Sequence, residues 1–527
     1  MSATTDNRRF VRANVVVATG TALSRITGFG RVAALAYALG QTSLTDTYNL
    51  ANTMPNVVYE LILGGILTTT LVPVFVSHLD RDDKEATDAV VSVVVVVLLA
   101  LTVVAVFAAP LIVHLYTVRV PAGDADAVRE EATTLARFFL PQIAFYGITS
   151  LGIALLNSRR RFAAAAFAPV LNNVIVIGAL LALPHVVNGD ITLDSALGNR
   201  TVTLLLGLGT TAGIVAMTAV IWIAVGHAGI HIHPRFLWRH PAVREVARLS
   251  SWTIGYVIAN QVALLIVSIL ALRNAGQLSA YQAAFIFFQL PHGLLAVTLI
   301  TTFAPELAEA ATRGEHDAYK NRLSLGVRLI ALVMAPAAIG YAVLARPLVS
   351  ALIERGALSS SEAILTGKTL AWFAVGLVGF SIYLFVLSGF YARKDTRRPF
   401  WLNVVENTIN IVLAVIFVGR WGAPGLAASY AIAYTISAVL ATVWLSHVAG
   451  GLGLRDLAIG VARPIAVALV MGALVWGLAS LVGSEHGTGA ITRSLVGVAI
   501  GLAAYVGGLL VLRVPEVVAL RARFRDR

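Results

Sequence analysis

Long apolar segments recur along the whole sequence, and they limit the fold more than any other feature. Each is long enough to cross a membrane as a helix, which takes about 20 predominantly apolar residues. Only 13% of the 527 residues are charged, too few for the surface of a soluble protein. We predict an all-α polytopic membrane protein with about 14 transmembrane helices. The predicted spans are residues 14–40, 47–77, 87–117, 132–157, 163–185, 201–226, 247–272, 280–308, 322–352, 363–391, 399–418, 423–447, 458–482 and 490–512.

Basic residues gather in every second connection between these spans. With a cytoplasmic N-terminus, loops such as "SRRRF" and "ARKDTRRP" lie inside, and loops such as "PAGDADAVRE" and "GSEHGTG" lie outside. Lys and Arg then favour the inside by about three to one, as the positive-inside rule requires. An even number of spans returns the C-terminus to the cytoplasm. The net charge of +12 therefore indicates orientation, and we expect no nucleic-acid partner.

Motifs for catalysis or nucleotide hydrolysis are missing from the sequence. There is no cysteine, which excludes disulfides, thiol catalysis and cysteine metal sites. The glycine-rich stretch "LLGLGTTAG" has no lysine, so Gly209 and Gly213 indicate close helix packing rather than a phosphate loop. His227, His231 and His233 are close enough in sequence for a metal site, but a polar turn at the membrane boundary is the simpler interpretation. We predict a protein that is not an enzyme and holds no metal.

The sequence repeats itself weakly at an offset of about 235 residues, the mark of a duplicated transporter fold. "LARFF" at Leu135 matches "LAWFA" at Leu370, Asn172 matches Asn407, and Pro55 matches Pro291 one residue out of step. An even number of spans separates equivalent points, so the two copies share an orientation. We predict two six-helix lobes related by a pseudo-two-fold axis along the membrane normal, with a central cavity. The predicted segments are an N-terminal lobe (1–230), a C-terminal lobe (231–450), and an extra helix pair with a short basic tail (451–527).

Two arginines lie inside the first predicted span. Arg25 lies roughly 17 Å into it, near the middle of the hydrocarbon, and Arg31 lies about 9 Å further along. A central arginine costs at least ~2.5 kcal/mol on insertion scales, so a function is the default explanation. We favour an anion site lining the cavity, because the guanidinium fork matches phosphate oxygens. The alternative is that both snorkel or pair with an acid such as Asp46. Gly28 and Gly30 lie between the two arginines and are candidate bending points of the helix.

Polar side chains also fall inside later spans. Asn172 and Asn173 are best explained as interhelical hydrogen bonds. Glu406 is different, because a carboxylate within a membrane is a functional hypothesis by default. With Asn407 and Asn410 it is a candidate site for a coupling cation or proton. A structural ion pair or a position at the membrane boundary is the alternative.

The opening segment resembles the MurJ/MviN lipid II flippases of the multidrug/oligosaccharidyl-lipid/polysaccharide exporter superfamily. The resemblance rests on Ser24-Arg25, Gly28-Phe29-x-Arg31, Asp46, Pro55-Asn56 and Val72-Pro73, and on "FQLPHGLLAVTLITTFAPEL" (Phe288 to Leu307) in the second half. It covers essentially the whole chain. Some actinobacterial relatives carry a large cytoplasmic C-terminal extension, and the chain resembles the type without one.

The resemblance implies a function. That family moves lipid II, an undecaprenyl-pyrophosphate-linked disaccharide-pentapeptide, from the inner to the outer leaflet of the bacterial cytoplasmic membrane by alternating access. It implies that Arg25, Arg31 and Asp46 bind the pyrophosphate in a cationic cavity, and that the last helix pair supplies a groove for the lipid tail. We expect no cofactor, and the sequence does not decide whether membrane potential, Na+ or H+ drives the cycle. Peptidoglycan-synthesis or divisome proteins are the expected protein partners.

The chain departs from the family pattern at two positions. Tyr59 and Glu60 follow the Pro-Asn motif where the family often has arginine, and Ile286 replaces another arginine before the second-half proline. Two cavity cations are therefore missing, and the pyrophosphate site is expected to be built differently. The candidate cavity and gating residues are Gly28, Gly30, Pro55, Asn56, Tyr59, Glu60 and Pro291.

Three other functions remain open at this point. A flippase for another polyprenyl-pyrophosphate oligosaccharide, of the capsule or O-antigen type, would need the same cations. A multidrug cation antiporter of the same superfamily would want acidic cavity residues instead. A membrane scaffold that transports nothing would have no need of arginines in mid-membrane.

Overall fold

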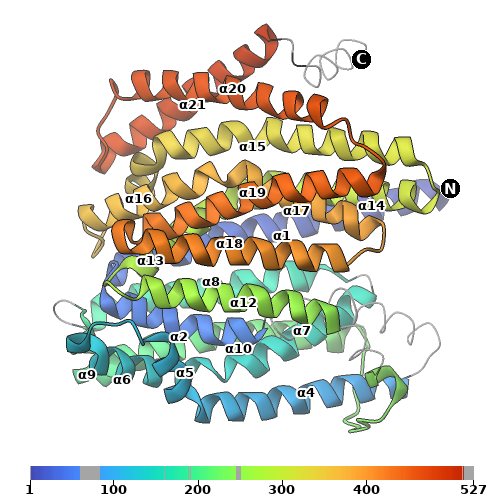
Figure 1. The fold of residues 1–527 in the computed structure, drawn as a ribbon. Coiled ribbons are helices and arrows are strands. Elements are labelled where there is room, and N and C mark those ends of the chain that lie inside the picture. Colours follow the sequence, from blue (N-terminus) through green and yellow to red (C-terminus); the bar gives the residue numbers. More distant parts are fainter. Residues whose placement is uncertain are drawn as a thin grey trace. The chain divides into compact units, whose positions relative to one another are not determined.

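The protein is helical throughout the part of the chain that the structure describes (Figure 1). This computed structural model describes residues 2–59, 84–159, 161–187, 189, 191–244, 251–512 and 514. The chain divides into two compact units, Met1–Gly276 and Gln277–Arg527, called unit 1 and unit 2 below. The three predicted segments, which rest on an internal repeat rather than on contacts, stay a prediction.

Unit 1 is organised around α8, which packs against α1 on one side and α10 on another. Small residues allow these approaches. A Cβ on Gly20 of α1 would lie 2.6 Å from the Cβ of Ala166 of α8. On α10, a Cβ on Gly209 would lie 2.4 Å from the Cβ of Ala179, which confirms the predicted packing role of this glycine. The helices are α1 (Ser2–Leu39), α2 (Ser43–Tyr59), α4 (Lys84–Phe107), α5 (Ala109–Tyr116), α6 (Ala122–Phe139), α7 (Gln142–Ser158), α8 (Ala163–Val186), α9 (Leu193–Gly198), α10 (Arg200–His227) and α12 (Ser251–Ala271).

Unit 2 is organised around the long helix α15, along which α16, α17, α20 and α21 pack. A cluster of buried apolar side chains that includes Leu344, Met471 and Tyr505 joins α15 to α20 and α21. The helical segments are α13 (Gln277–Pro291), η3 (His292–Ala296), α14 (Val297–Thr312), α15 (His316–Ile353), α16 (Ser360–Val375), α17 (Leu377–Ala392), α18 (Arg397–Trp421), α19 (Ala423–Ala449), α20 (Leu454–Ala479) and α21 (Gly487–Val511).

Each of the predicted spans contains a helix in the described residues, so the all-α membrane class is confirmed. Ten helical stretches are long and apolar enough to cross a membrane, or 11 when the bent pair α16 and α17 counts as one span. Helices α1, α2 and α12 coincide with three further predicted spans. The second half of the predicted span 47–77 lies outside the described residues.

Several spans depart from a regular α-helix, and prolines account for two of these irregularities. Pro141 separates α6 from α7, and Pro291 ends α13 and is followed by the π-helical turn η3. Proline lacks the N–H that continues the helical ladder, so the next residues adopt another hydrogen-bond pattern. Helices α16 and α17 meet at Gly376 with a bend of 46°. Span 280–308 thus lies in one continuous helical stretch, Gln277–Thr312, with a π-helical turn after Pro291.

Candidate functional site

Arg31 is held by a short chain of hydrogen bonds that crosses unit 1. Its Nη2 donates to the phenol oxygen of Tyr48 on α2 over 3.3 Å. That oxygen lies 2.8 Å from the hydroxyl of Thr210 on α10. The Tyr48 ring is only 1% exposed and meets Phe139 edge-on, with ring centroids 5.5 Å apart. Arg31 itself is partly buried. A fully buried tyrosine therefore orients a cation whose guanidinium keeps other donors free for a ligand.

Arg25 lies two turns earlier on α1, and its side chain is exposed. Within the described residues it has no hydrogen bond or ion pair. The neighbouring backbone is tied to α8, because Nδ2 of Asn173 donates to the Ser24 carbonyl over 3.2 Å and to the Thr27 hydroxyl over 3.1 Å. The interhelical bond predicted for Asn173 is thus confirmed. Arg25 therefore remains available to a ligand beside a fixed stretch of helix.

The two glycines between these features lie against α8. Helix α1 stays helical through both Gly28 and Gly30. A Cβ on Gly28 would lie 3.6 Å from Nδ2 of Asn173, and one on Gly30 would lie 3.4 Å from Cδ1 of Ile177. Both are ordinary contact distances, so the glycines are not required by packing here. Their bending role stays a prediction.

Asp46 lies in the first turn of α2 and is 3% exposed. Its Oδ2 accepts a hydrogen bond from the backbone N–H of Gly276 over 2.7 Å. Gly276 has φ +78°, and a Cβ there would lie 2.3 Å from the carbonyl oxygen of Gln41, so only glycine fits. Asp46 also lines a polar cavity of about 210 Å³ with Asp124 and Arg273. The Asp46 carboxylate bonds a backbone turn, and Arg31 bonds Tyr48.

The remaining candidates on α2 are only partly described. Pro55 is buried inside the helix, and Asn56 donates from Nδ2 to the carbonyl of Asn52 over 3.0 Å, a bond within its own helix. Tyr59 is the last residue of α2, and Glu60 lies outside the described residues, as do Val72 and Pro73. Their roles stay predictions.

In unit 2, Pro291 is followed by a histidine that sequence reasoning did not single out. His292 is buried in the π-turn, and its Nδ1 lies 3.0 Å from the hydroxyl of Ser381 on α17. Its ring centroid lies 4.6 Å from that of Phe380. The partly buried Ile286 lies one turn before Pro291 on α13, where the family pattern has arginine. The π-helical turn after Pro291 is therefore packed and hydrogen-bonded rather than open.

The polar cluster of α18 is buried inside unit 2. Both carboxylate oxygens of Glu406 are buried, and neither has a hydrogen-bond partner in the described residues. Asn407 donates to the carbonyl of Asn403 over 2.9 Å, and Oδ1 of Asn410 accepts from Ser429 of α19 over 3.0 Å. Glu406 thus has no ion pair in the described residues, and its side chain is 1% exposed. A buried carboxylate of this kind needs a proton or a cation.

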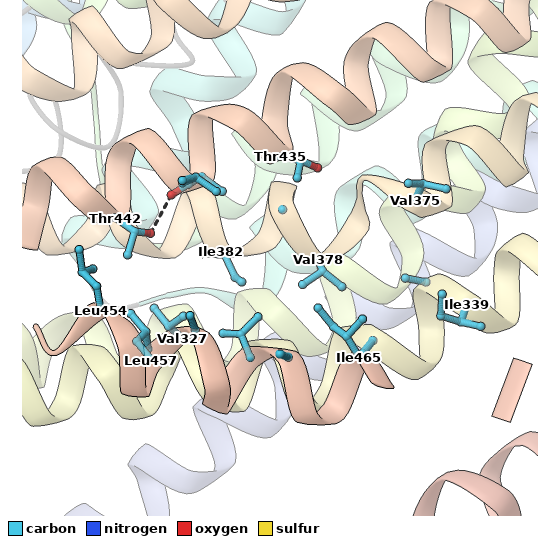
Figure 2. A pocket seen from close by; sticks show the side chains of 18 of the residues that line it. Val327, Ile339, Val375, Val378, Ile382, Thr435, Thr442, Leu454, Leu457 and Ile465 are labelled. Atoms are coloured by element: carbon cyan, nitrogen blue, oxygen red, sulfur yellow. Dashed lines mark hydrogen bonds between the residues drawn. The ribbon is translucent and has the colours of Figure 1, made fainter. Parts of the chain in front are cut away.

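An apolar groove of about 620 Å³ runs along unit 2 (Figure 2). Among the described lining residues, only Thr435 and Thr442 bear hydroxyls, and these donate to the carbonyls of Ala431 and Ala438 in their own helix. Their oxygens can still accept a hydrogen bond, but the surface of the groove is almost entirely apolar. The side chains labelled in Figure 2 are Val327, Ile339, Val375, Val378, Ile382, Thr435, Thr442, Leu454, Leu457 and Ile465, from α15, α16, α17, α19 and α20. Of the final helix pair, α20 lines the groove, and α21 contributes none of its lining residues.

The histidine cluster forms no metal site in the described residues. They contain no group of three or more His, Asp or Glu side chains placed to hold a metal. His233 instead contacts Asp88 of α4, with Nδ1 and Oδ2 3.7 Å apart. The turn after α10 is thus explained by local contacts.

These features define a class of protein: a multi-pass helical membrane transporter with two arginines on α1 and an apolar groove. More particularly, the chain belongs to the family described as "Lipid II flippase MurJ", whose sequence profile matches residues 35–497.

Similar proteins are found by sequence and by structure. A probable lipid II flippase MurJ of Rhizobium meliloti (strain 1021) is 29% identical over 435 residues, 80% of this chain and 79% of that protein. One from Vibrio cholerae serotype O1 is 26% identical over 525 residues, 97% of each chain. A solved structure of lipid II flippase MurJ in an inward closed conformation matches with a TM-score of 0.76 at 20% identity, covering 95% of this chain and all of that one. An inward-facing multidrug transporter of the MATE family matches at 0.66 and 15%, covering 80% and 94%.

Proposed function

We propose that this protein moves lipid II from the inner to the outer leaflet of the bacterial cytoplasmic membrane, with both termini in the cytoplasm. The observation that carries the proposal is the pair of cations on α1, Arg31 held by Tyr48 and Arg25 exposed beside it. Two arginines on a membrane helix, one fixed and one open, suit a pyrophosphate, because each guanidinium can bind two phosphate oxygens.

Transport of such a lipid divides into two physical problems. The pyrophosphate and sugars cannot cross hydrocarbon unaided, because each unpaired polar group costs several kcal/mol there. A cationic cavity that opens alternately to the two sides removes that barrier. The polyprenyl tail needs only an apolar path, and the groove of unit 2 has the right chemistry because its surface is almost entirely apolar.

The substrate assignment follows the family and is tested by leaflet-resolved measurement of lipid II. In cells depleted of the protein, we expect lipid II to accumulate in the inner leaflet and wild-type protein to restore its export. Arg25→Ala and Arg31→Ala should fail to restore export although the protein is present in the membrane. Arg119→Ala, which removes an exposed arginine from the connection between α5 and α6, is the matched control and should restore it.

A different outcome selects a different substrate. If lipid II export is normal in depleted cells and another polyprenyl-pyrophosphate oligosaccharide accumulates inside, that lipid replaces lipid II in the proposal. If neither accumulates and the cells become sensitive to cationic drugs, the antiporter alternative holds. Peptidoglycan-synthesis and divisome proteins are the expected protein partners under the lipid II assignment.

We further propose that Glu406, with Asn407 and Asn410, binds a coupling Na+ or proton. The support is the buried carboxylate without a hydrogen-bond partner in the described part of unit 2. Membrane potential is a second driving force, since one charge moved through 100 mV is worth ~2.3 kcal/mol. In proteoliposomes, headgroup translocation should depend on an imposed Na+ or proton gradient in the wild type and lose that dependence in Glu406→Gln. Identical rates and end points under every gradient and potential would make the protein a passive scramblase.

A further inference from the structure

The connection between α10 and α12 is a folded segment with two unlike faces. Residues 230–244 of this connection lie within the described part of the chain. Ile230 and Ala242 are buried in an apolar cluster with side chains of α4, α7 and α10 such as Val91 and Leu155. One face of the connection is therefore part of the core of unit 1. This anchoring also fixes the outward-facing residues of the connection relative to unit 1.

Two backbone hydrogen bonds lay this segment along α4. The N–H of His233 donates to Oδ1 of Asp88 over 3.1 Å, and the N–H of Arg235 donates to the hydroxyl of Ser92 over 2.8 Å. Asp88 and Ser92 are one helical turn apart, and the next residues of α4 read "VVVVVLLA". The segment therefore runs from the polar end of α4 toward its apolar part, where Val97 is exposed.

The outer face at that point is apolar and cationic together. Phe236 is 56% exposed, Leu237 38% and Trp238 58%. The guanidinium carbon of Arg239 lies 4.6 Å from the centre of the Trp238 ring. Arg235 and Arg239 are exposed, and within the described residues neither side chain has an ion pair. Exposing three adjacent large apolar side chains to water is unfavourable. At a bilayer interface the apolar side chains can enter the hydrocarbon while the flanking arginines, which have no ion pair in the described residues, stay at the headgroups.

We propose that residues 235–239 form an interfacial site for anionic phospholipid headgroups. Phe236, Leu237 and Trp238 insert among the acyl chains, and Arg235 and Arg239 bind the phosphates. Tryptophan favours the headgroup level, and each arginine near an anionic surface adds attraction. A lipid is favoured over a soluble partner because the segment follows α4 toward its lipid-exposed part. The proposal is independent of which lipid the protein transports.

The absence of cysteine from the chain makes the insertion directly measurable. Leu237→Cys carries a single spin label, and His316→Cys, at the exposed first residue of α15, carries the control label. The protein is reconstituted in phosphatidylcholine vesicles with and without phosphatidylglycerol. We expect the label at position 237 to be accessible to oxygen and shielded from a water-soluble nickel reagent, and the control label to show the reverse. A water-accessible label at position 237 in both vesicles would overturn the proposal. So would one that is shielded only in native membranes, because a protein partner would then cover the site.

The headgroup part is tested by binding of phosphatidylglycerol to the purified full chain. The double variant Arg235→Gln, Arg239→Gln keeps both backbone N–H groups, so the bond to Ser92 remains. We expect its affinity for phosphatidylglycerol to fall roughly tenfold, while affinity for phosphatidylcholine is unchanged. The control Arg119→Gln, Lys368→Gln removes the same charge from two exposed positions elsewhere and should bind as the wild type does. Equal affinity of both double variants would show that the arginines are not the headgroup site.

Discussion

The phenol oxygen of Tyr48 accepts a hydrogen bond from Nη2 of Arg31 and lies 2.8 Å from the hydroxyl of Thr210. This relationship joins α1, α2 and α10 at one buried oxygen. Tyr48 is therefore a positioning residue: it orients the guanidinium of Arg31, but it is buried and cannot contact a ligand itself. The same oxygen can donate to Thr210 while it accepts from Arg31, so both bonds can be satisfied at once.

Tyr48→Phe should impair transport without unfolding unit 1. The phenyl ring keeps its edge-on contact with Phe139, but Arg31 loses its partner, at an expected ~1–2 kcal/mol. That corresponds to a loss of about five- to thirty-fold in transport efficiency. Initial rates in proteoliposomes should show the loss mainly in the apparent KM. Thr210→Val should give a smaller loss in the same direction. An unchanged KM together with a lowered melting temperature would indicate a purely structural role.

Arg31→Lys should retain only part of the activity that Arg31→Ala abolishes. Lysine keeps the charge but has no fork with which to bind two phosphate oxygens and Tyr48 together. The same order, wild type above lysine above alanine, is expected at Arg25. Headgroup translocation in proteoliposomes at matched protein density measures it. Full activity of either alanine variant would remove that arginine from the site.

Gly213→Ala should destabilise unit 1 by about 1–3 kcal/mol, because it forces α8 and α10 apart. A Cβ there would lie 2.4 Å from Oδ1 of Asn172 and 2.9 Å from its carbonyl oxygen. Thermal unfolding in detergent measures the effect. Gly226→Ala on the same helix meets no atom within 4 Å and is the matched control. Equal melting temperatures for the two variants would contradict the close packing.

Glu354 should make stability depend on pH in the acid range. Burial raises the pKa of its carboxyl, but hydrogen bonds from Ser350 and Ser360 and the charge of Arg346 outweigh burial, so the pKa lies below its ordinary 4.5. A folded pKa below the unfolded one stabilises the protein above the unfolded value, and the contribution disappears as the pH falls through the folded value. Glu354→Gln should therefore lower the melting temperature by about 1–2 °C at pH 7. The difference should shrink as the pH falls below 4.5, and a difference that stayed constant there would contradict this assignment.

The sequence predicts the spans well, because an apolar run is a local property. An apolar run of about 20 residues forms a helix in a membrane whatever its neighbours are. Arg25 and Arg31 stand out because they interrupt such a run. The sequence makes Pro291 a candidate gating residue, but it does not indicate the π-turn that follows.

Other parts of the site depend on contacts between distant residues. Tyr48 and Thr210 are 162 positions apart and are ordinary residues for helices, so nothing local signals their bond. The turn at Gly276 that Asp46 binds was also invisible to periodicity. The lining residues of the groove cannot be recognised from the sequence for a related reason. They are as apolar as residues that face lipid, and only the packing of α15, α17, α19 and α20 distinguishes the two environments.

The hydroxyls of Thr435 and Thr442 donate to carbonyls of their own helix, and this affects how the groove selects among lipid tails. A surface that presents almost only methyl and methylene groups cannot distinguish one hydrocarbon chain from another by directed bonds. Any discrimination between cargo lipids that differ only in their tails must come from fit and from the abundance of each lipid in the bilayer. Under the proposed function, the protein would then transport short-chain analogues of the carrier lipid whenever their headgroup is correct. A soluble test substrate can therefore be chosen with a short tail.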